Sequence, residues 1–266
     1  MPHAPVNGVS IYYEELGSGE PLLLIMGQGS DHHGWDAARE DFAARHRVIV
    51  FDHRGTGESD KPREPAYSIE GFAADVIGLL DHLGIERAHA YGISMGGRIG
   101  QRLGIDHGDR LGALVLGCTT PGNAHGVSRP SEVDAEMANR PADVDARVAF
   151  MAGQMVSPGY LAAHPEYLVT ARARAMNPIP TYAQKMHYLA SEGHDAWDRL
   201  PEISAPTLVI HGTDDRINPT ANAALLAGRI PGAELYLVEG GRHGYFIEFR
   251  EEASAVVLDF LARHPI

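Results

Sequence analysis

The sequence predicts an α/β protein with a mostly parallel sheet, and three observations support this prediction. Short apolar runs alternate with segments of helical periodicity along most of the chain. Two of the runs, PLLLIM and RVIVF, are continuously apolar, which is typical of strands covered on both faces. The alternation stops once, over a long segment rich in Ala, Met, Arg and Pro, and then returns. We therefore expect helices on both faces of the sheet and an all-helical insertion at one end of it.

The first half of the chain contains the expected elements in regular order. Strands are expected at Val9–Tyr13, Pro21–Met26, Arg47–Phe51, Ala88–Tyr91 and Leu111–Gly117. Helices are expected at Trp35–Arg45, after Ser68, and at about Met95–Asp106. The second helix follows from one apolar stripe between Ile69 and Leu83, with Ser68 as its N-cap. The turn Asp52–Ser59 contains no P-loop lysine, so we interpret it as structural.

The pattern changes between Pro121 and about Asp198, where we expect no strand. Prolines interrupt this segment at seven positions, which predicts several short helices. Beyond it we expect a strand at Pro206–His211, a helix near Thr220–Arg229, a strand at Ala233–Val238 and a helix near Ile247–Arg263. Strands from both sides are needed for one core. We therefore expect a core domain of residues 1–120 and 198–266, with residues 121–197 as a helical cap.

Composition excludes several functional classes. The chain has 266 residues, 22 of them basic and 35 acidic, so its formal charge is −13. No basic stripe is available for nucleic acid or for an anionic membrane surface, so we expect neither as a partner. The single cysteine, Cys118, excludes an intramolecular disulfide and a Cys-rich zinc site. No signal peptide or membrane-spanning run is visible, so we expect a cytoplasmic protein; the sequence leaves its oligomeric state open.

A candidate nucleophile lies between an expected strand and an expected helix. Residues 92–96 read G-I-S-M-G, which fits the G-x-S-x-G pattern. In that context a sharp turn projects the Ser94 hydroxyl above the carboxyl end of the sheet. The alternative is a glycine-rich turn with an incidental serine. A serine hydroxyl is a poor nucleophile, and it needs a base that is itself oriented by a carboxylate.

Residues that fit these two roles follow later strands. Asp214 and Asp215 come after the strand PTLVIH, and His243 comes between glycines after the strand AELYLV. The carboxyl ends of parallel strands are where α/β sheets place their sites. The order serine, acid, histidine is the order that this architecture requires. From the residues alone, either aspartate could orient the histidine.

Taken together, these segments resemble the α/β-hydrolase superfamily over nearly the whole chain except the insertion. The resemblance implies a mostly parallel sheet of eight strands with a helical cap. In this family the acid turn commonly reads G-x-x-D-x-x-x-P, which Gly212, Asp215 and Pro219 fit, so Asp215 is assigned as the acid and Asp214 as a turn residue. Some members carry the acid after an earlier strand. The corresponding turn here begins at Cys118 and contains no carboxylate.

The resemblance also predicts an oxyanion hole made by two backbone N–H groups. One belongs to Met95, the residue after the nucleophile. The second is expected from Gln28, in the loop after PLLLIM. Many relatives have His-Gly in that loop, whereas this chain has Met26-Gly27. Trp35 resembles the aromatic residue that often closes the loop, although packing in the core is our preferred interpretation of it.

The insertion predicts an apolar binding pocket. It contains five of the eight methionines, and methionine adapts to irregular apolar shapes. The side chains could instead pack cap helices together. The residues expected to contact substrate are Gly27, Trp35, Met151, Met155, Tyr188 and Tyr245. We assign no metal and no cofactor, because the adjacent His32 and His33 have neither a neighbouring cysteine nor helical ligand spacing.

We therefore expect a serine hydrolase that cleaves an apolar, small-molecule carboxylic ester or lactone through an acyl-enzyme. The oxyanion loop and the strand–helix turn resemble those of small bacterial esterases and lactonases, including polyketide methylesterases and 3-oxoadipate enol-lactonases. The alternatives that retain the same residues are a cofactor-free perhydrolase of the haloperoxidase type, a carbon–carbon bond hydrolase, a hydroxynitrile lyase and a non-catalytic ligand receptor. Serine at position 94 disfavours a dehalogenase or an epoxide hydrolase, which have aspartate there.

Overall fold

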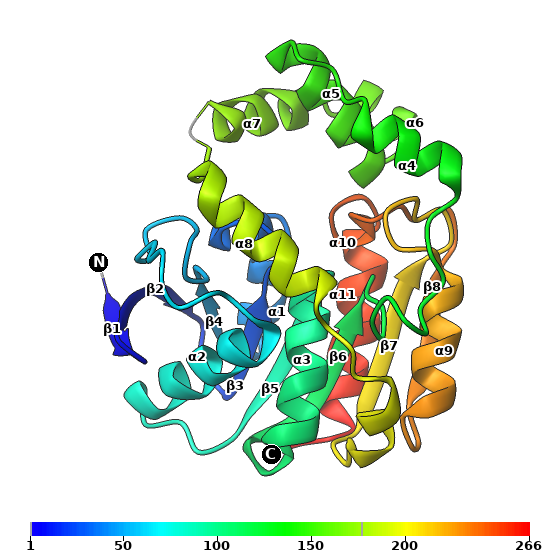
Figure 1. Cartoon of the computed structure of the whole chain (residues 1–266). Helices are drawn as coiled ribbons and strands as arrows, with labels where there is room; N and C mark the ends of the chain where they lie inside the picture. The colour runs from blue at the N-terminus through cyan, green and yellow to red at the C-terminus, as the bar shows by residue number, and fades with distance from the viewer. Residues whose placement is uncertain (1, 177) are drawn as a thin grey trace.

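The computed structural model describes residues 2–176 and 178–266, and within them eight strands form one sheet (Figure 1). The strands are β1 His3–Val6, β2 Val9–Leu16, β3 Glu20–Ile25, β4 His46–Phe51, β5 Ala88–Ile93, β6 Leu111–Gly117, β7 Thr207–Gly212 and β8 Glu234–Val238. Their spatial order is β1-β2-β4-β3-β5-β6-β7-β8. The two pairings of β2 are antiparallel and all the other pairings are parallel. The predicted fold class, a mostly parallel eight-stranded sheet, is therefore confirmed.

Helices cover both faces of this sheet, as the continuous apolar strands require. They are α1 Arg39–Ala43, α2 Ile69–His82, α3 Met95–Asp106, α9 Ala221–Arg229, α10 Tyr245–Glu248 and α11 Arg250–Ala262. Successive residues of β3 point to opposite faces of the sheet and pack into different apolar clusters. Leu23 packs into one apolar cluster with residues of α2, α3 and α9, whereas Leu22 packs into a second cluster with residues of α1 and α11. The core therefore consists of two apolar layers, one on each side of the sheet.

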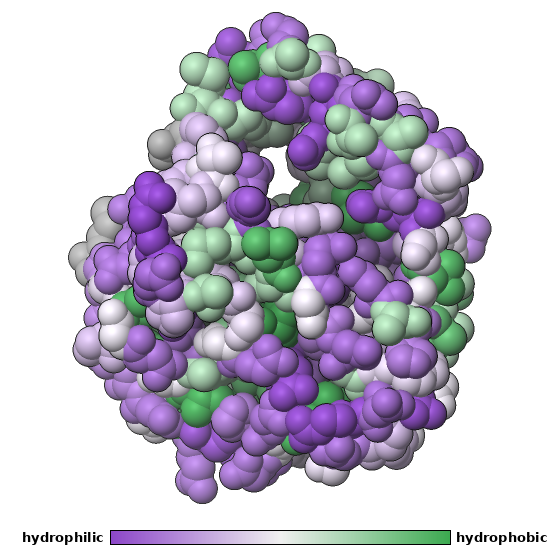
Figure 2. Space-filling model, in the orientation of Figure 1, coloured by the Kyte–Doolittle hydropathy of each residue, from purple (hydrophilic) through white to green (hydrophobic). Residues whose placement is uncertain are grey.

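Five α-helices lie in the described residues between β6 and β7. They are α4 Ser131–Ala138, α5 Val144–Met155, α6 Pro158–Ala163, α7 Pro165–Ala175 and α8 Thr181–Glu192. They form an arch above the carboxyl ends of the strands (Figure 1), and an opening separates the arch from the sheet edge (Figure 2). Pro158 and Pro165 lie in the first turns of α6 and α7, and Pro130 and Pro180 are the N-cap residues of α4 and α8. These prolines therefore mark helix starts, where the missing N–H costs nothing.

Two of the predicted helices are divided in the structure. Trp35–Arg45 becomes a 3₁₀ turn at His32–Trp35 followed by α1, because Asp36 and Ala38 donate their N–H groups three residues back and not four. The final predicted helix is divided at Phe249 into α10 and α11. The edge strand β1 was not predicted. In the described part of the chain, no helix combines the length and apolarity required to cross a bilayer.

Candidate active site

The strand–helix turn at Ser94 has the strained geometry that its sequence predicts. Ser94 has φ 56° and ψ −118° and is half-buried between β5 and α3. A Cβ atom on Gly92 would lie 2.1 Å from the carbonyl oxygen of Gly96, and one on Gly96 would lie 2.1 Å from that of Ile25. Both glycines are therefore required by close backbone approach. The Ser94 N–H donates to the carbonyl of Gly117 at 2.8 Å, which fixes the turn to β6.

Parallel register brings the candidate residues to the same edge of the sheet. Ile93 pairs with Gly117, and Gly117 pairs with Ile210 of β7. Gly212 at the end of β7 pairs with Val238 at the end of β8. The residues that follow these four strands therefore meet above the carboxyl ends of the strands.

The acid and the histidine predicted from the sequence are hydrogen bonded. His243 Nδ1 lies 2.8 Å from Asp215 Oδ2, and both side chains are buried. The other carboxylate oxygen of Asp215 accepts the N–H groups of Ile217 and Asn218 at 2.8 and 2.9 Å. The carboxylate is thus fully engaged and points at the imidazole, whereas Asp214 is exposed.

Burial and charge act in opposite directions on this pair. Burial, the largest single effect, would lower the pKa of His243, but the charges and hydrogen bonds of Asp215 and Cys118 together outweigh it and raise this pKa well above its usual value. Burial alone would raise the pKa of Asp215, but the imidazoles of His243 and His211 outweigh it and lower that pKa. Asp215 therefore stays ionised and makes His243 a stronger base than an isolated histidine.

Two neighbours of this pair were not predicted. The Nε2 atom of His211, on β7, donates to the carbonyl of Asn218 at 2.8 Å and lies 3.2 Å from Asp215 Oδ2. Cys118 follows β6 with φ 40° and is fully buried. Ligand atoms of Cys118, Asp215 and His243 lie within 4.8 Å of one another, and they are the group in residues 2–176 and 178–266 that comes nearest to a metal-ligand set. The sequence signal that could have identified Cys118 was its position in the turn after β6, at a strand end next to the other candidate residues.

The predicted oxyanion loop lies against the candidate nucleophile. A Cβ atom on Gly27 would lie 3.2 Å from Ser94 Cβ and 3.7 Å from Ser94 Oγ. Gln28 is the next residue, and its side chain is exposed. Met95 is the first residue of α3, so its N–H is among those without a partner inside the helix. The two predicted N–H donors thus belong to segments that meet at Ser94.

Two buried histidines hold this loop, and neither was predicted. His53 donates from Nε2 to the carbonyl of Met26 at 3.0 Å. His187, on α8 of the arch, donates from Nε2 to the carbonyl of Arg54 at 2.8 Å, and its Nδ1 accepts the N–H of Gly29 at 3.4 Å. Burial lowers the pKa of His53, and it lowers the pKa of His187 to about 4. Both rings are therefore neutral near pH 7, as these tautomers require.

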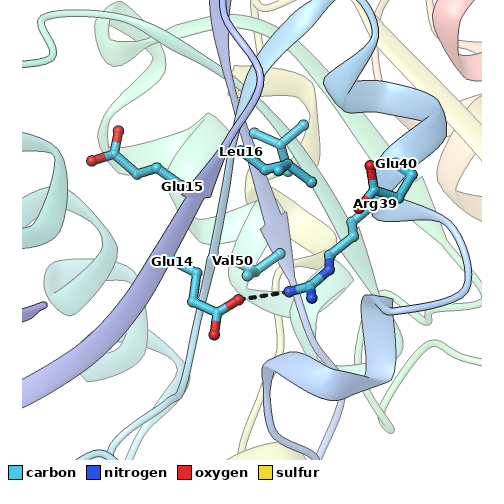
Figure 3. A pocket seen from close by; sticks show the side chains of 7 residues that line it. Glu14, Glu15, Leu16, Arg39, Glu40 and Val50 are labelled. Atoms are coloured by element: carbon cyan, nitrogen blue, oxygen red, sulfur yellow. Dashed lines mark hydrogen bonds and ion pairs between the residues drawn. The ribbon is translucent and has the colours of Figure 1, made fainter. Parts of the chain in front are cut away.

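A second polar group anchors the far end of the same loop. Asp52 Oδ1 accepts the backbone N–H of His32 at 2.7 Å and lies 2.8 Å from His32 Nδ1. Glu14 lies 3.5 Å from His32 Nε2 and pairs with Arg39 at 2.7 Å (Figure 3). The pocket beside this ion pair has a volume of about 80 Å³, well below that of ordinary ligand sites. We therefore interpret these polar contacts as a structural anchor of the loop, and the small pocket beside them is not the substrate site.

The residues predicted to contact substrate are in different environments. Met151 and Met155 are half-buried on α5, and Tyr188 is 50% exposed on α8. Trp35 and Tyr245, however, are 0% exposed. The Trp35 ring packs in the core, and the Tyr245 hydroxyl lies 2.8 Å from that of Tyr91. The prediction that these two side chains contact substrate is therefore wrong, because their surfaces are already covered by the core.

The chain is similar to known proteins over nearly its whole length. The family model for the alpha/beta hydrolase fold matches residues 20–152. A putative carbamate hydrolase RutD from Azorhizobium caulinodans is 31% identical, over 98% of each chain. The enol-lactonase from Burkholderia xenovorans LB400 superposes with a TM-score of 0.84 at 28% identity, over 98% of this chain and 100% of that one. Est816, described as an N-acyl homoserine lactone degrading enzyme, gives 0.82 at 33% identity, with the same coverage. The chain is therefore a hydrolase that belongs to the α/β-hydrolase fold family.

Proposed function

We propose that this hydrolase cleaves a small, apolar carboxylic ester or lactone through an acyl-enzyme formed on Ser94. The observation that carries the proposal is the 2.8 Å contact between His243 Nδ1 and the buried Asp215 carboxylate, at the sheet edge where Ser94 lies. That contact leaves His243 Nε2 as the basic atom of the ring. A nucleophile, a base and an orienting acid in these roles support acyl transfer.

In the first half of the reaction, Ser94 Oγ attacks the carbonyl carbon as His243 Nε2 takes the hydroxyl proton. The carbonyl oxygen becomes an anion that accepts hydrogen bonds from the N–H groups of Gln28 and Met95. The anion then collapses, the bond to the leaving oxygen breaks, and His243 donates its proton to that oxygen. An alcohol leaves from an ester, whereas in a lactone the freed hydroxyl remains on the acyl group.

In the second half, water replaces the leaving group. His243 takes a proton from the water as its oxygen attacks the acyl carbon, and the same N–H groups stabilise the second anion. The bond to Ser94 Oγ then breaks, and His243 returns the proton to that oxygen. A carboxylic acid is released and the free enzyme is restored. No metal or cofactor is required by these steps.

The position of the arch supports a pocket for the acyl or alcohol part of the substrate. We propose that residues 121–197 act as a cap over the site, across the opening seen in Figure 2. Met151, Met155 and Tyr188 on its helices would contact the substrate, and Gly27 would lie beside the reacting carbonyl. The two lactone-cleaving proteins with similar structures support lactones within this class. The carbamate hydrolase relative supports a carbamate as a second candidate, since the same serine attack applies to its carbonyl.

The proposal is tested by comparing wild type with Ser94→Ala on p-nitrophenyl esters from acetyl to dodecanoyl, on N-acyl homoserine lactones and on carbamate. We expect turnover of at least one series by wild type, and a loss of about 10⁴–10⁶ in kcat in the variant. The acyl chain length that gives the highest kcat/KM then indicates the length of the pocket. Equal turnover by the two proteins would exclude Ser94 as the nucleophile. A folded wild type inactive on every substrate would contradict the proposed reaction.

A further inference from the structure

We propose that the arch positions the base of the reaction, and that the contact between Ser157 and Glu248 is the link through which it does so. The inference rests on the proposed function, because it concerns the residue that acts there as the base. It assigns residues that position the base to the helical segment whose His187 already contacts the oxyanion loop.

The end of α5 is hydrogen bonded to the loop that carries His243, which we call the base loop (residues 239–244). The N–H of Gly244, the next residue, donates to the carbonyl of Met155 at 2.7 Å. On the other side of His243, the Arg242 guanidinium donates to the carbonyl of Gly153. Both residues that flank the imidazole are therefore bonded to the last turn of α5. The positions of the loop and of this turn are fixed together.

A charged contact reinforces these two bonds. Glu248 is the last residue of α10, which begins two residues after His243. One carboxylate oxygen of Glu248 accepts the Ser157 N–H at 2.7 Å, and the other accepts the Ser157 hydroxyl. The pair is partly buried, and a hydrogen bond to a charged acceptor is about twice as strong as a neutral one. Ser157 also caps α6 by accepting the Tyr160 N–H at 3.1 Å.

The core holds the other side of α10. Tyr245, its first residue, is fully buried and bonded to Tyr91 on β5. The segment between His243 and Glu248 is thus fixed at one side by the core and at the other by the arch. A displacement of about 1 Å in a catalytic group can cost about 100-fold in rate. Loss of the arch contact should therefore slow the chemical step more than it weakens substrate binding.

The arch also contacts the turn that carries Asp215, but this contact is more exposed than the one between Ser157 and Glu248. Arg216, next to Asp215, pairs with Glu136 of α4 at 2.8 Å, but their side chains are 36% and 45% exposed. Exposed ion pairs contribute little. The base loop and the helix α10 that follows it have three separate attachments to the arch, and the Arg242 and Glu248 attachments each involve a charged, partly buried group. The histidine therefore depends on the arch more strongly than the acid does.

The experiment compares Ser157→Ala with Asp143→Ala by steady-state kinetics and thermal unfolding. Asp143 caps α5 by accepting the Ala146 N–H at 2.9 Å, so this control removes an N-cap from the same arch without touching the base loop. We expect Ser157→Ala to lower kcat about 10-fold, with KM changed by less than about 3-fold. Asp143→Ala should lower the melting temperature similarly and keep kcat. Ser157→Thr, which restores a hydroxyl, should recover most of the loss.

Glu248→Gln provides a second test that leaves the cap of α6 intact. It should lower kcat in the same way, and combining it with Ser157→Ala should add less than the sum of the two effects, because both remove one contact. The inference is overturned if both single variants, shown to be folded, keep the kcat of Asp143→Ala, or if their effects simply add. The absence of Ser94-dependent turnover in wild type would overturn the proposed function. Ser94-dependent turnover in wild type that both single variants leave unchanged would overturn this inference alone.

Discussion

The charge on Asp215 sets the pH range in which His243 can accept a proton. Because the carboxylate raises the pKa of the imidazole, replacing it by a neutral amide should lower that pKa. We expect Asp215→Asn to reduce kcat/KM by about 10⁴, as loss of the orienting acid does in serine proteases. The remaining activity should persist to lower pH than in wild type. The measurement is kcat/KM against pH for both proteins.

Asp214→Asn is the matched control for that experiment. The two aspartates are adjacent in the chain, but the Asp214 side chain points into solvent and Asp215 is buried against two imidazoles. We expect Asp214→Asn to change kcat/KM by less than about 3-fold. A large loss in this variant together with a small one in Asp215→Asn would reassign the acid.

At the scale of the element, the turn between β5 and α3 requires glycine for a reason that can be isolated. A Cβ atom at position 96 would lie 2.1 Å from the backbone of β3, whose position is set by the core. We expect Gly96→Ala to lower both the melting temperature and kcat, because the helix must move away from the oxyanion loop. Circular dichroism melts and ester hydrolysis measure the two effects.

Gly228→Ala serves as the comparison for Gly96→Ala. Gly228 lies in α9, and a Cβ atom there would meet nothing within 4 Å. Alanine is favoured over glycine in a helix by about 1 kcal/mol, so this variant should be slightly more stable than wild type and equally active. If both alanine variants behaved alike, steric approach at position 96 would not explain the motif.

The elements that could be predicted are those whose signal is local. The bounds of α3 match the predicted Met95–Asp106, and Ser68 caps α2 by accepting the Gly71 N–H as predicted. The strand β1 is four residues long and contains a proline, so it has no usable periodicity. The break in the predicted helix Trp35–Arg45 arises because the 3₁₀ turn at His32–Trp35 packs Trp35 into the core. Tertiary contacts of this kind have no signature in a short window of sequence.

The same division applies to the site. Ser94, Asp215 and His243 follow strand ends, and strand ends can be inferred from apolar runs and turn residues. His187 and Ser157 belong to the insertion, and their contacts with the oxyanion and base loops depend on how the arch is seated on the sheet. That seating is fixed by side chains far apart in the chain, such as His187 and Gly29. The sequence pattern therefore predicts the residues proposed to act on substrate, but not those that hold them in place.

For the whole molecule, buried neutral histidines predict loss of stability in mild acid. Burial lowers the pKa of His187 to about 4 and that of His194 to about 3, whereas an unfolded histidine has a pKa near 6.5. The unfolded chain therefore takes up these protons first. The stability that the two residues contribute is complete above about pH 6.5 and is lost as the pH falls towards 4 and 3. Urea unfolding at a series of pH values measures this loss.

His187→Gln isolates one part of that effect. Glutamine is neutral throughout the range, so the variant should lose less unfolding free energy than wild type between about pH 6.5 and 4, even if it is less stable at pH 7. Burial would lower the pKa of His32, but Asp52 and the neighbouring acidic groups raise it. The stability that His32 contributes is therefore complete throughout this pH range and does not alter the comparison. Identical pH dependence in wild type and His187→Gln would show that folding does not lower the pKa of His187.

The arch leaves the sheet and returns to it at neighbouring positions. It departs after β6 and comes back to β7, and these strands are paired, with Gly117 opposite Ile210. A bridge between Gly122 and Asp195 joins its two legs near the base. An excursion whose ends already lie side by side can change in length at small entropic cost, because the cost of closure grows only with the logarithm of length. The length of the arch could therefore change at little entropic cost to the sheet that carries it.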